Sequence, residues 1–382
     1  MSTDLITTAR NTSLGELAAM LEDQQTHKHD VVVPAAALRC HRGALHLADG
    51  HTRLSPTGVT RTDAVLAPTR LAENGVAAKL DIPVAYLRRL RERDLDLYDA
   101  NINGWLAHQP RRRFLLRSLI DHDGHGALRA MLSDSYAPVD NLDVLTSVLA
   151  GITEAGASVD IAQADLTESR MYVKVRSREI AAMAPALLGN YVSPFTGARG
   201  ADNPVVFAGF VVSNSETGHG KFSITPQLTV QVCNNGMTIP AHAHAKIHLG
   251  GKLPDGEIRW SDDTQQASLR LVHKRARDAV ATFLSEEFLT RRLAEIENEA
   301  ATAITDPAPV IEHVGATLGF SQAARTAIMA RFVQGADLSS GGVLHAVTAA
   351  AQDLDDADES HDLEATGLRA MSAAAAFTRR HG

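Results

Sequence analysis

Residues 205–253 hold more β-branched residues, glycines and histidines than any other part of the chain. This stretch contains two apolar runs, 205–212 and 222–232, with a sequence of glycines and polar residues at 213–220 between them. Apolar runs rich in β-branched residues and separated by turn formers are typical of paired antiparallel strands. We therefore predict a β-hairpin here, as the centre of the fold.

Length and composition favour a mixed architecture. The chain has 382 residues, of which 45% are hydrophobic but only 4% aromatic, so it can form a substantial core with few large side chains. Helices packed through alanine and aliphatic residues, with a modest sheet holding the large side chains, fit this composition. We predict an α+β fold: a curved antiparallel sheet with packed helices, plus a helical C-terminal region.

Changes in local pattern divide the chain into three parts. We interpret residues 1–70 as an N-terminal extension with short strands, 71–305 as the α+β core and 306–382 as a helical C-terminal region. Alternating apolar and polar residues at 158–178 predict a second hairpin. The acidic run 353–364 is interpreted as a solvated connector or mobile tail.

Helical patterns appear at several places. Ser13 is a candidate cap for a helix near the start of the chain, and 265–296 is predicted to be one long amphipathic helix. Over 71–93, two helical patterns are separated by a break that contains Pro83, which resembles helix-turn-helix order.

Charge and cysteine content indicate the environment of the protein. The formal net charge of −8 means that binding to nucleic acid or to an anionic membrane requires local basic patches. Two cysteines, Cys40 and Cys233, do not make a disulfide framework and favour a reducing compartment. No apolar run approaches the ~20 residues of a membrane-spanning helix. We expect a cytoplasmic protein without membrane contact.

Sequence signatures of common enzymes are absent. The chain has no G-x-x-x-x-G-K-[ST], G-x-G-x-x-G, G-x-S-x-G, H-E-x-x-H or paired C-x-x-C motif. These are the signatures of P-loop nucleotide hydrolases, dehydrogenases, serine hydrolases, metalloproteases and zinc fingers. We therefore expect no cofactor and favour a protein that is not an enzyme.

Basic residues gather at three places that can contact phosphates. Arg111, Arg112 and Arg113 form a cluster without a nearby acid, which is the strongest phosphate candidate in the chain. The others are on the second strand of the hairpin at 158–178 and on the long helix, at Lys174, Arg176, Lys274, Arg275 and Arg277. Basic residues on solvated strand and helix faces look the same in a sequence, so this alternative stays open.

Four ordered motifs resemble a known family. LRAMLSDSYAPVDNLDVL, GFVVSNSETGHGKFSITPQLTVQVCNNGMTI, HLGG and WSDDT, in this order, look like the phage/plasmid-like family called domain of unknown function 932, over roughly residues 77–281. The family occurs on phages, plasmids and mobile regions. The resemblance implies a nucleic-acid role, in recombination by binding or annealing single-stranded DNA.

Two other functions compete with nucleic-acid binding. His242, His244 and His248 share one face if the segment is a strand, and with Asp263 they would form a metal site for a hydrolase or nuclease. The helical C-terminal part could instead serve as a protein-interaction scaffold. The turn 214–220 is a further candidate site, because its backbone amides could cradle an anion.

Our leading expectation is a single-stranded DNA-binding protein that assembles into a homo-oligomer. Such an assembly would join modest basic patches into one continuous binding surface.

Overall fold

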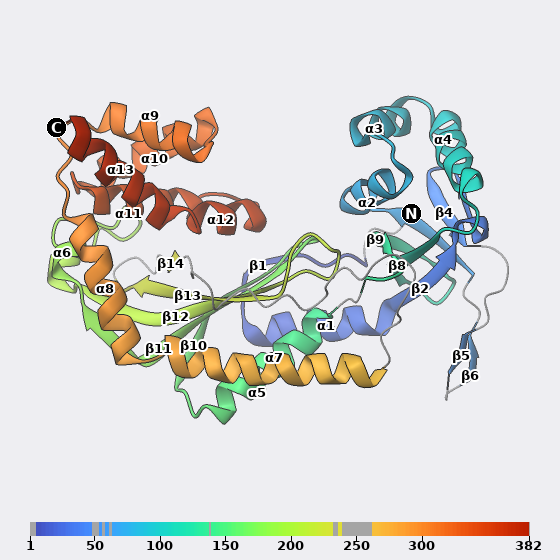
Figure 1. Ribbon diagram of the computed structural model, residues 1–382, viewed down its shortest axis with the longest axis horizontal. Helices are drawn as coiled ribbons and strands as arrows, with labels where there is room; N and C mark the ends of the chain where they lie inside the picture. Colours follow the sequence, from blue (N-terminus) through green and yellow to red (C-terminus); the bar gives the residue numbers. More distant parts are fainter. Residues whose placement is uncertain are drawn as a thin grey trace.

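The computed structural model describes residues 5–47, 53–55, 58–60, 63–136, 139–231, 236–238 and 262–381. Within this part the molecule is elongated and has two lobes, each built on its own six-stranded sheet (Figure 1). Helices cover the sheets and form a layer at the C-terminal end. The predicted α+β class is confirmed, with an antiparallel sheet, a second curled sheet of mixed direction and a helical C-terminal region.

The first lobe contains the mixed sheet, in the strand order β2-β8-β9-β7-β4-β3. Among the described strands of this sheet, β7 and β9 are the one pair that runs in parallel. Its strands are β2 (Lys28–Pro34), β3 (Leu38–His41), β4 (Ala44–Leu47), β7 (Ala64–Pro68), β8 (Arg113–Ile120) and β9 (His125–Ser133). The turn η1 (Ala35–Ala37) and helices α2 (Arg70–Leu80), α3 (Val84–Arg93) and α4 (Leu95–His108) complete this lobe, and β5 (Arg53–Ser55) and β6 (Gly58–Thr60) form a separate pair.

The second lobe contains the antiparallel sheet, in the order β1-β10-β11-β12-β13-β14. Its strands are β1 (Ala9–Thr12), β10 (Val159–Leu166), β11 (Met171–Met183), β12 (Val205–Asn214), β13 (Ser223–Val230) and β14 (Gly236–Thr238). Both predicted hairpins are therefore present, as β10-β11 and as β12-β13, and all four strands are inner strands of the sheet. Short turns α6 (Pro185–Leu188) and η2 (Gly200–Asp202) connect β11 to β12.

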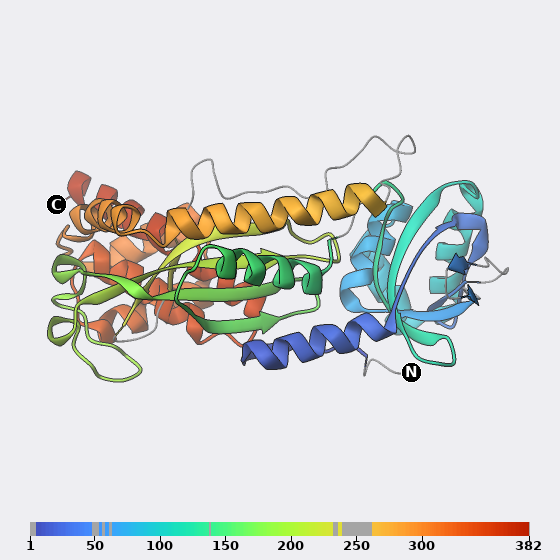
Figure 2. The same ribbon diagram turned by 90° about the horizontal axis from the view of Figure 1, so that it is seen from below.

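The two faces of this sheet are covered by different helices. Helices α1 (Leu14–His27), α5 (Asn141–Glu154) and α7 (Asp262–Phe283) lie side by side below one face (Figure 2). Alternate residues such as Val173 and Val175 share an apolar core with Val148 of α5 and Val272 of α7. Because successive side chains of a strand point to opposite faces, the polar residues between them face the C-terminal helices.

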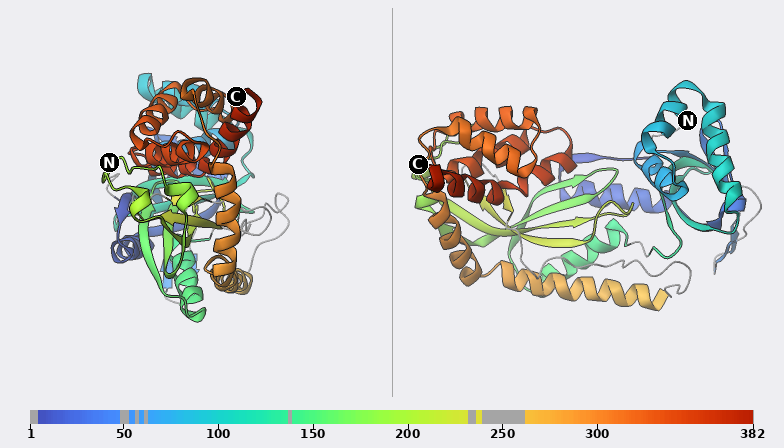
Figure 3. Two further views of the ribbon diagram at one scale, coloured as in Figure 1. Left: turned by 90° about the vertical axis from the view of Figure 1, so that its left-hand side faces the viewer. Right: turned by 45° about the horizontal axis from the view of Figure 1, so that its top comes forward.

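Six helices form the C-terminal part of the chain. They are α8 (Glu286–Ala300), α9 (Pro307–Leu318), α10 (Gln322–Gly335), α11 (Ser340–Gln352), α12 (Ala357–Glu364) and α13 (Gly367–His381). In the end-on view of Figure 3, the layer that holds α9 to α13 lies on one side of the sheet and α5 and α7 lie on the other. This layer has an apolar core of its own, which includes Ile304, Val314, Phe332 and Val347.

The first lobe is an insertion into the second. Strand β1 pairs with β10, and α1 packs on α5 and β10, so both belong to the second lobe; the chain then enters the first lobe at Lys28 and returns at α5. The cores therefore divide the chain at other places than expected. Residues 1–70 do not form a separate extension, because β7 and α2, on either side of residue 70, pack into one core.

Ends of helices follow local capping chemistry. Ser13 caps α1, as predicted, and forms a capping box in which the Glu16 carboxylate accepts a hydrogen bond from the backbone N–H of Ser13. The single helix expected over 265–296 is two helices instead. The first helix ends at Phe283, and Ser285 caps α8 by accepting a hydrogen bond from the N–H of Phe288.

The acidic run 353–364 is not a mobile tail. Most of it forms α12, which packs against the polar face of the second sheet (Figure 1). Asp358 accepts hydrogen bonds from Thr167 and Tyr172, and Glu364 is 2% exposed. Because these carboxylates have partners on the sheet, the run is ordered. No helix in the part of the chain that the structure describes is long and apolar enough to cross a membrane.

Candidate functional site

The end of the first lobe that lies away from the second carries an exposed aromatic ring beside exposed cations. Trp105, near the end of α4, is 41% exposed, and its ring contacts His108 edge-on at 6.0 Å. Arg111, Arg112 and Arg113 follow at the start of β8, and all three are exposed. The predicted arginine cluster therefore lies on the surface.

A small hollow of about 80 Å³ brings the ring and one of the arginines together. Trp105 and Arg112 both line it, and the Arg112 guanidinium lies over the Phe114 ring, with its central carbon 5.2 Å from the ring centre. Nη1 of Arg112 also donates to Oε1 of Gln109 at 3.2 Å, and this hydrogen bond holds the guanidinium beside the hollow. Asp81 also lines the hollow, so one carboxylate shares it with the Arg112 guanidinium, and the cluster is not without a nearby acid as the sequence suggested.

The basic residues of β11 occupy a covered position. Lys174 is 9% exposed, and its Nζ lies 2.7 Å from Oε2 of Glu364 in α12. Arg176 lies 3.6 Å from Asp160 and 5.2 Å from the ring centre of Phe207. Lys174 therefore faces α12 rather than solvent, which corrects the expectation of a basic outer face on this hairpin.

The basic residues of α7 are divided between the surface and a contact with α5. Lys274 and Arg275 are exposed. Arg277 donates to Glu154 of α5 at 2.9 Å and also pairs with Asp278. Hydrogen bonds to Glu154 and Asp278 raise the pKa of Arg277 above its usual value. Of the three predicted cations, two remain available to a ligand.

The eight predicted basic residues therefore lie in three separate places. One group is at the far end of the first lobe, one is beneath α12, and one is on the outer side of α7. Arg113 lies four residues before Arg117, at which β8 meets the second lobe. At about 3.3 Å per residue, this places Arg113 about 13 Å along the strand from that contact. Within one copy of the described chain the three groups do not form one track.

The predicted metal site cannot be placed. His242, His244 and His248 lie outside the described residues, as does the side chain of Asp263, and Cys233 is also outside them. Among the side chains that the structure does describe, no group of three histidine, cysteine or acidic residues is arranged to hold a metal ion. The other cysteine, Cys40, is buried and donates to Asp99, and burial followed by this carboxylate raises the pKa of its thiol.

The turn 214–220 is a structural contact rather than an open anion cradle. Ser215, Glu216 and Thr217 are all buried. One Glu216 oxygen accepts from the N–H of Asn141, at the start of α5, at 2.6 Å, and the other lies 2.7 Å from Arg129 of β9. The protein's own carboxylate thus occupies the helix N-terminus where an external anion would bind.

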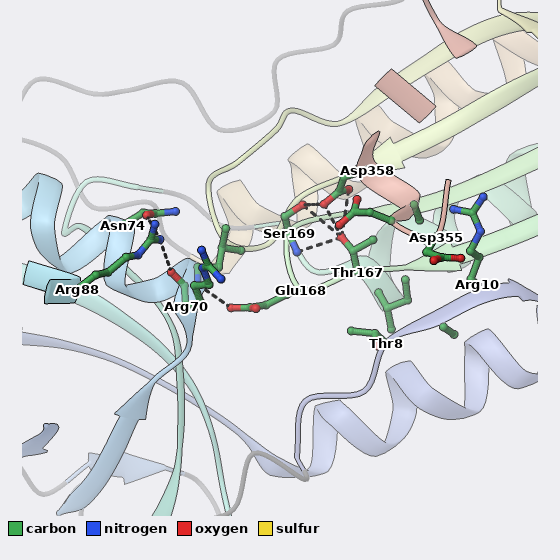
Figure 4. Close-up of a pocket in the computed structure, with 15 residues that line it drawn as sticks. Thr8, Arg10, Arg70, Asn74, Arg88, Thr167, Glu168, Ser169, Asp355 and Asp358 are labelled. Carbon is green, nitrogen blue, oxygen red and sulfur yellow. Dashed lines mark hydrogen bonds between the residues drawn. The ribbon is translucent and has the colours of Figure 1, made fainter. Parts of the chain in front are cut away.

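A cavity of about 540 Å³ is lined by residues of both lobes (Figure 4). Three arginines and four carboxylates line it, so it has no excess of positive charge for a polyanion: Arg10, Arg70, Arg88, Glu168, Asp355, Asp356 and Asp358. Several of these groups bond to one another across the cavity wall. Arg88 donates to the carbonyl oxygen of Arg70 at 3.2 Å, and Glu168 accepts from the N–H of Leu71 at the same distance.

Two features of this arrangement were not predicted from the sequence. Trp105 was not connected with the arginine cluster, although only a few residues separate them and an exposed tryptophan beside arginines is a recognisable signal. Arg117 was also missed. An arginine within the apolar strand FLLRSLI is a sign of a buried charge with partners, which the sequence alone does not identify.

Comparison of the chain with protein-family models, with curated proteins and with solved structures found no match.

Proposed function

We propose that this protein binds single-stranded DNA at the far end of its first lobe and is not an enzyme. The observation that carries the proposal is the hollow that Trp105 and Arg112 line together, with Arg111 and Arg113 exposed beside it. An exposed indole can stack on an unpaired base, and guanidinium groups bind phosphate oxygens in a bidentate manner. A base inside a duplex has no free face to offer, so the arrangement favours a single strand.

A second surface on α7 extends the proposal. Lys274 and Arg275 are exposed there, and Arg270, one helical turn before Lys274, is exposed as well. Because this surface and the arginine cluster lie on different lobes, one short strand segment would not contact both in a single copy. A homo-oligomer would place several copies of each surface along one strand, and we include this assembly in the proposal.

The setting of the proposal comes from the resemblance to domain of unknown function 932. That family occurs on phages and plasmids, where single-stranded DNA arises during recombination. Annealing of strands in the cytoplasm is the activity that this setting favours.

The test is fluorescence anisotropy of labelled oligothymidine and of a labelled duplex with the purified protein, at low and moderate salt, with and without a chelator. We expect binding to the single strand that weakens steeply with salt and is unchanged by chelator. Arg111→Ala, Arg112→Ala and Arg113→Ala together should remove most of it. The matched control is Arg379→Ala with Arg380→Ala, two exposed arginines at the end of α13.

Two results would contradict the proposal. One is the absence of binding even at low salt, and the other is a triple variant that binds as well as the wild type. Binding that chelator abolishes would favour instead the metal site at His242, His244 and His248, and metal analysis of the purified protein would follow.

A further inference from the structure

A cavity of about 340 Å³ lies between the polar face of the second sheet and helix α12. The sheet supplies Lys174 and Arg176 from β11 and Gln227 from β13, while β1 supplies Arg10 and α12 supplies Glu364. None of these residues takes part in the proposed DNA contact at Trp105 and the arginine cluster. Apart from the side chain of Ala162, the wall is polar or charged, so the cavity does not suit an apolar ligand.

Strand alternation explains why polar groups gather in this interior position. Val173 and Val175 point into the apolar core, so Lys174 between them points to the opposite face. Lys174 and Gln227 are 9% and 2% exposed, which is unusual for such side chains unless they have partners. Helix α12 supplies one partner, Glu364, which is itself 2% exposed.

The hydrogen-bond partners in the cavity leave donors in excess. One oxygen of Glu364 accepts from Lys174 at 2.7 Å and the other accepts from Gln227, so both carboxylate oxygens are already engaged. An ammonium group has three N–H donors, and Glu364 takes one of those of Lys174. Arg10 donates from Nη2 to Ser360 at 3.2 Å, but its Nη1 is buried and has no hydrogen-bond partner among the described residues.

The charges of the lining residues also favour an anionic ligand. Three cations, Arg10, Lys174 and Arg176, line the cavity, and Glu364 is the one carboxylate among the residues that line it. Asp160 pairs with Arg176 but is not part of the lining. A buried guanidinium nitrogen without a partner is costly, and an anion that accepts from it would remove this cost.

We infer that this cavity is a binding site for a small organic anion, a phosphate or carboxylate on a polar, hydroxyl-bearing body. The oxyanion accepts from the guanidinium of Arg10, which lines this cavity as well as the one between the lobes, and from the remaining N–H groups of Lys174. The volume is within the range of small-molecule sites and too small for a folded macromolecule. The rest of the wall is mostly polar, which suits a ligand that carries hydroxyl groups.

The test measures binding of three probes to the full chain: inorganic phosphate, glucose 6-phosphate and citrate. Thermal unfolding is followed at matched ionic strength against potassium chloride, and calorimetric titration gives the dissociation constant of each probe that stabilises. We expect a saturable rise of the midpoint, because a ligand of the native state stabilises it. Tighter binding of the two phosphates or of citrate would show whether the site takes a phosphate or a carboxylate.

Arg10→Gln tests the site with little risk to the fold, because Arg10 lies on the edge strand β1 and is only partly buried. It should weaken binding about tenfold or more, the usual effect of losing a hydrogen bond to a charged group. Arg178→Gln is the matched control, since Arg178 lies on β11 with Lys174 and Arg176, pairs with Asp160 and does not line the cavity. The triple alanine variant of Arg111 to Arg113 should bind the anion like the wild type, so failure of the proposed DNA function would leave this result untouched.

A second variant removes the buried pair as a unit. Lys174→Met with Glu364→Gln eliminates both charges together and should also abolish anion binding, with folding checked by circular dichroism. The inference is overturned if no probe stabilises the wild type beyond the chloride control. It is equally overturned if Arg10→Gln and the double variant fold and bind the probes as the wild type does.

Discussion

Nη2 of Arg117, in the first lobe, donates to Oδ1 of Asp140, in the second lobe, at 2.5 Å. The same guanidinium donates from Nε to Asp30 at 3.0 Å and from Nη1 to the carbonyl oxygen of Glu216 at 2.9 Å. Arg117 is 1% exposed. Burial alone would lower the pKa of its guanidinium, but Asp30, Asp140 and Glu216 raise it above the usual value. One side chain therefore connects both lobes at the place where the chain returns from the insertion.

Replacing Arg117 by methionine should destabilise the protein by about 3–5 kcal/mol, because Asp30 and Asp140 would lose a buried partner. Lys28 still pairs with Asp140, so the second lobe keeps part of the contact. Urea unfolding measures the loss. Arg117→Lys keeps a charge but has fewer donors, and we expect the stability of this variant to lie between that of the wild type and that of the methionine variant. A methionine variant as stable as the wild type would mean that the contact does not hold the lobes together.

Trp105→Ala should weaken binding of oligothymidine by about 1–3 kcal/mol, which is the usual contribution of one stacked base. Trp105→Phe keeps an aromatic face and should retain most of the affinity. Anisotropy gives both affinities, and intrinsic fluorescence should show quenching in the wild type that the alanine variant lacks. Equal affinity of the alanine and phenylalanine variants would exclude stacking at this position.

The salt dependence of binding should show how many cations contact phosphates. For single strands, each phosphate contact contributes about 0.7 to the slope of log K against log salt. Alanine at Arg111, Arg112 and Arg113 should therefore reduce the slope by roughly 2, and alanine at Lys274 and Arg275 by roughly 1.4. If only the variant at Arg111, Arg112 and Arg113 changes the slope, the bound DNA contacts the first lobe and not α7. If neither set does, both surfaces are excluded as phosphate contacts.

The hairpins were predictable because their signal is local. In β10-β11 and β12-β13, apolar side chains alternate within short runs, and the turn formers lie directly between the runs. The capped start of α1 is equally local, since Ser13 and Glu16 are three residues apart. For such elements the sequence pattern and the three-dimensional contact involve the same few residues.

Contacts between distant segments were not predictable in this way. Lys174 pairs with Glu364 across 190 positions of sequence, so its strand pattern looked the same as that of a strand facing water. The same applies to Glu216, whose turn has the composition of an exposed loop but which lies against Arg129 and the start of α5. A charged side chain is assigned to the surface by default, and only its partner reveals that it is buried.

Ser285→Ala should destabilise the protein by about 1 kcal/mol, because the first turn of α8 would lose its side-chain cap. Ser285→Asp should retain the cap, since a carboxylate also accepts from the N–H of Phe288. Thermal unfolding of both variants measures the difference. Equal melting temperatures for alanine and aspartate would show that the break between α7 and α8 does not depend on this serine.

The stability of the C-terminal helices should fall as the pH is lowered through the range of His345. This imidazole is buried in α11, stacks on Tyr191 with ring centres 4.1 Å apart and contacts the carbonyl oxygen of Leu187 through Nε2. Burial lowers its pKa from the usual 6.5 to about 4, against the opposing effect of the Leu187 carbonyl. The unfolded chain therefore binds a proton below pH 6.5 that the folded protein does not accept until about pH 4.

The contribution of His345 is thus fully present above pH 6.5 and is lost progressively down to pH 4, by an amount on the order of 3 kcal/mol. His345→Gln keeps a donor for Leu187 but does not titrate, so its stability should change less over this range. Urea midpoints at several pH values measure the effect for both proteins. Carboxylates such as Asp165, whose pKa is lowered from 3.8, titrate below this window and affect the two proteins alike. Parallel pH profiles for wild type and His345→Gln would mean that this histidine does not bind the extra proton on unfolding.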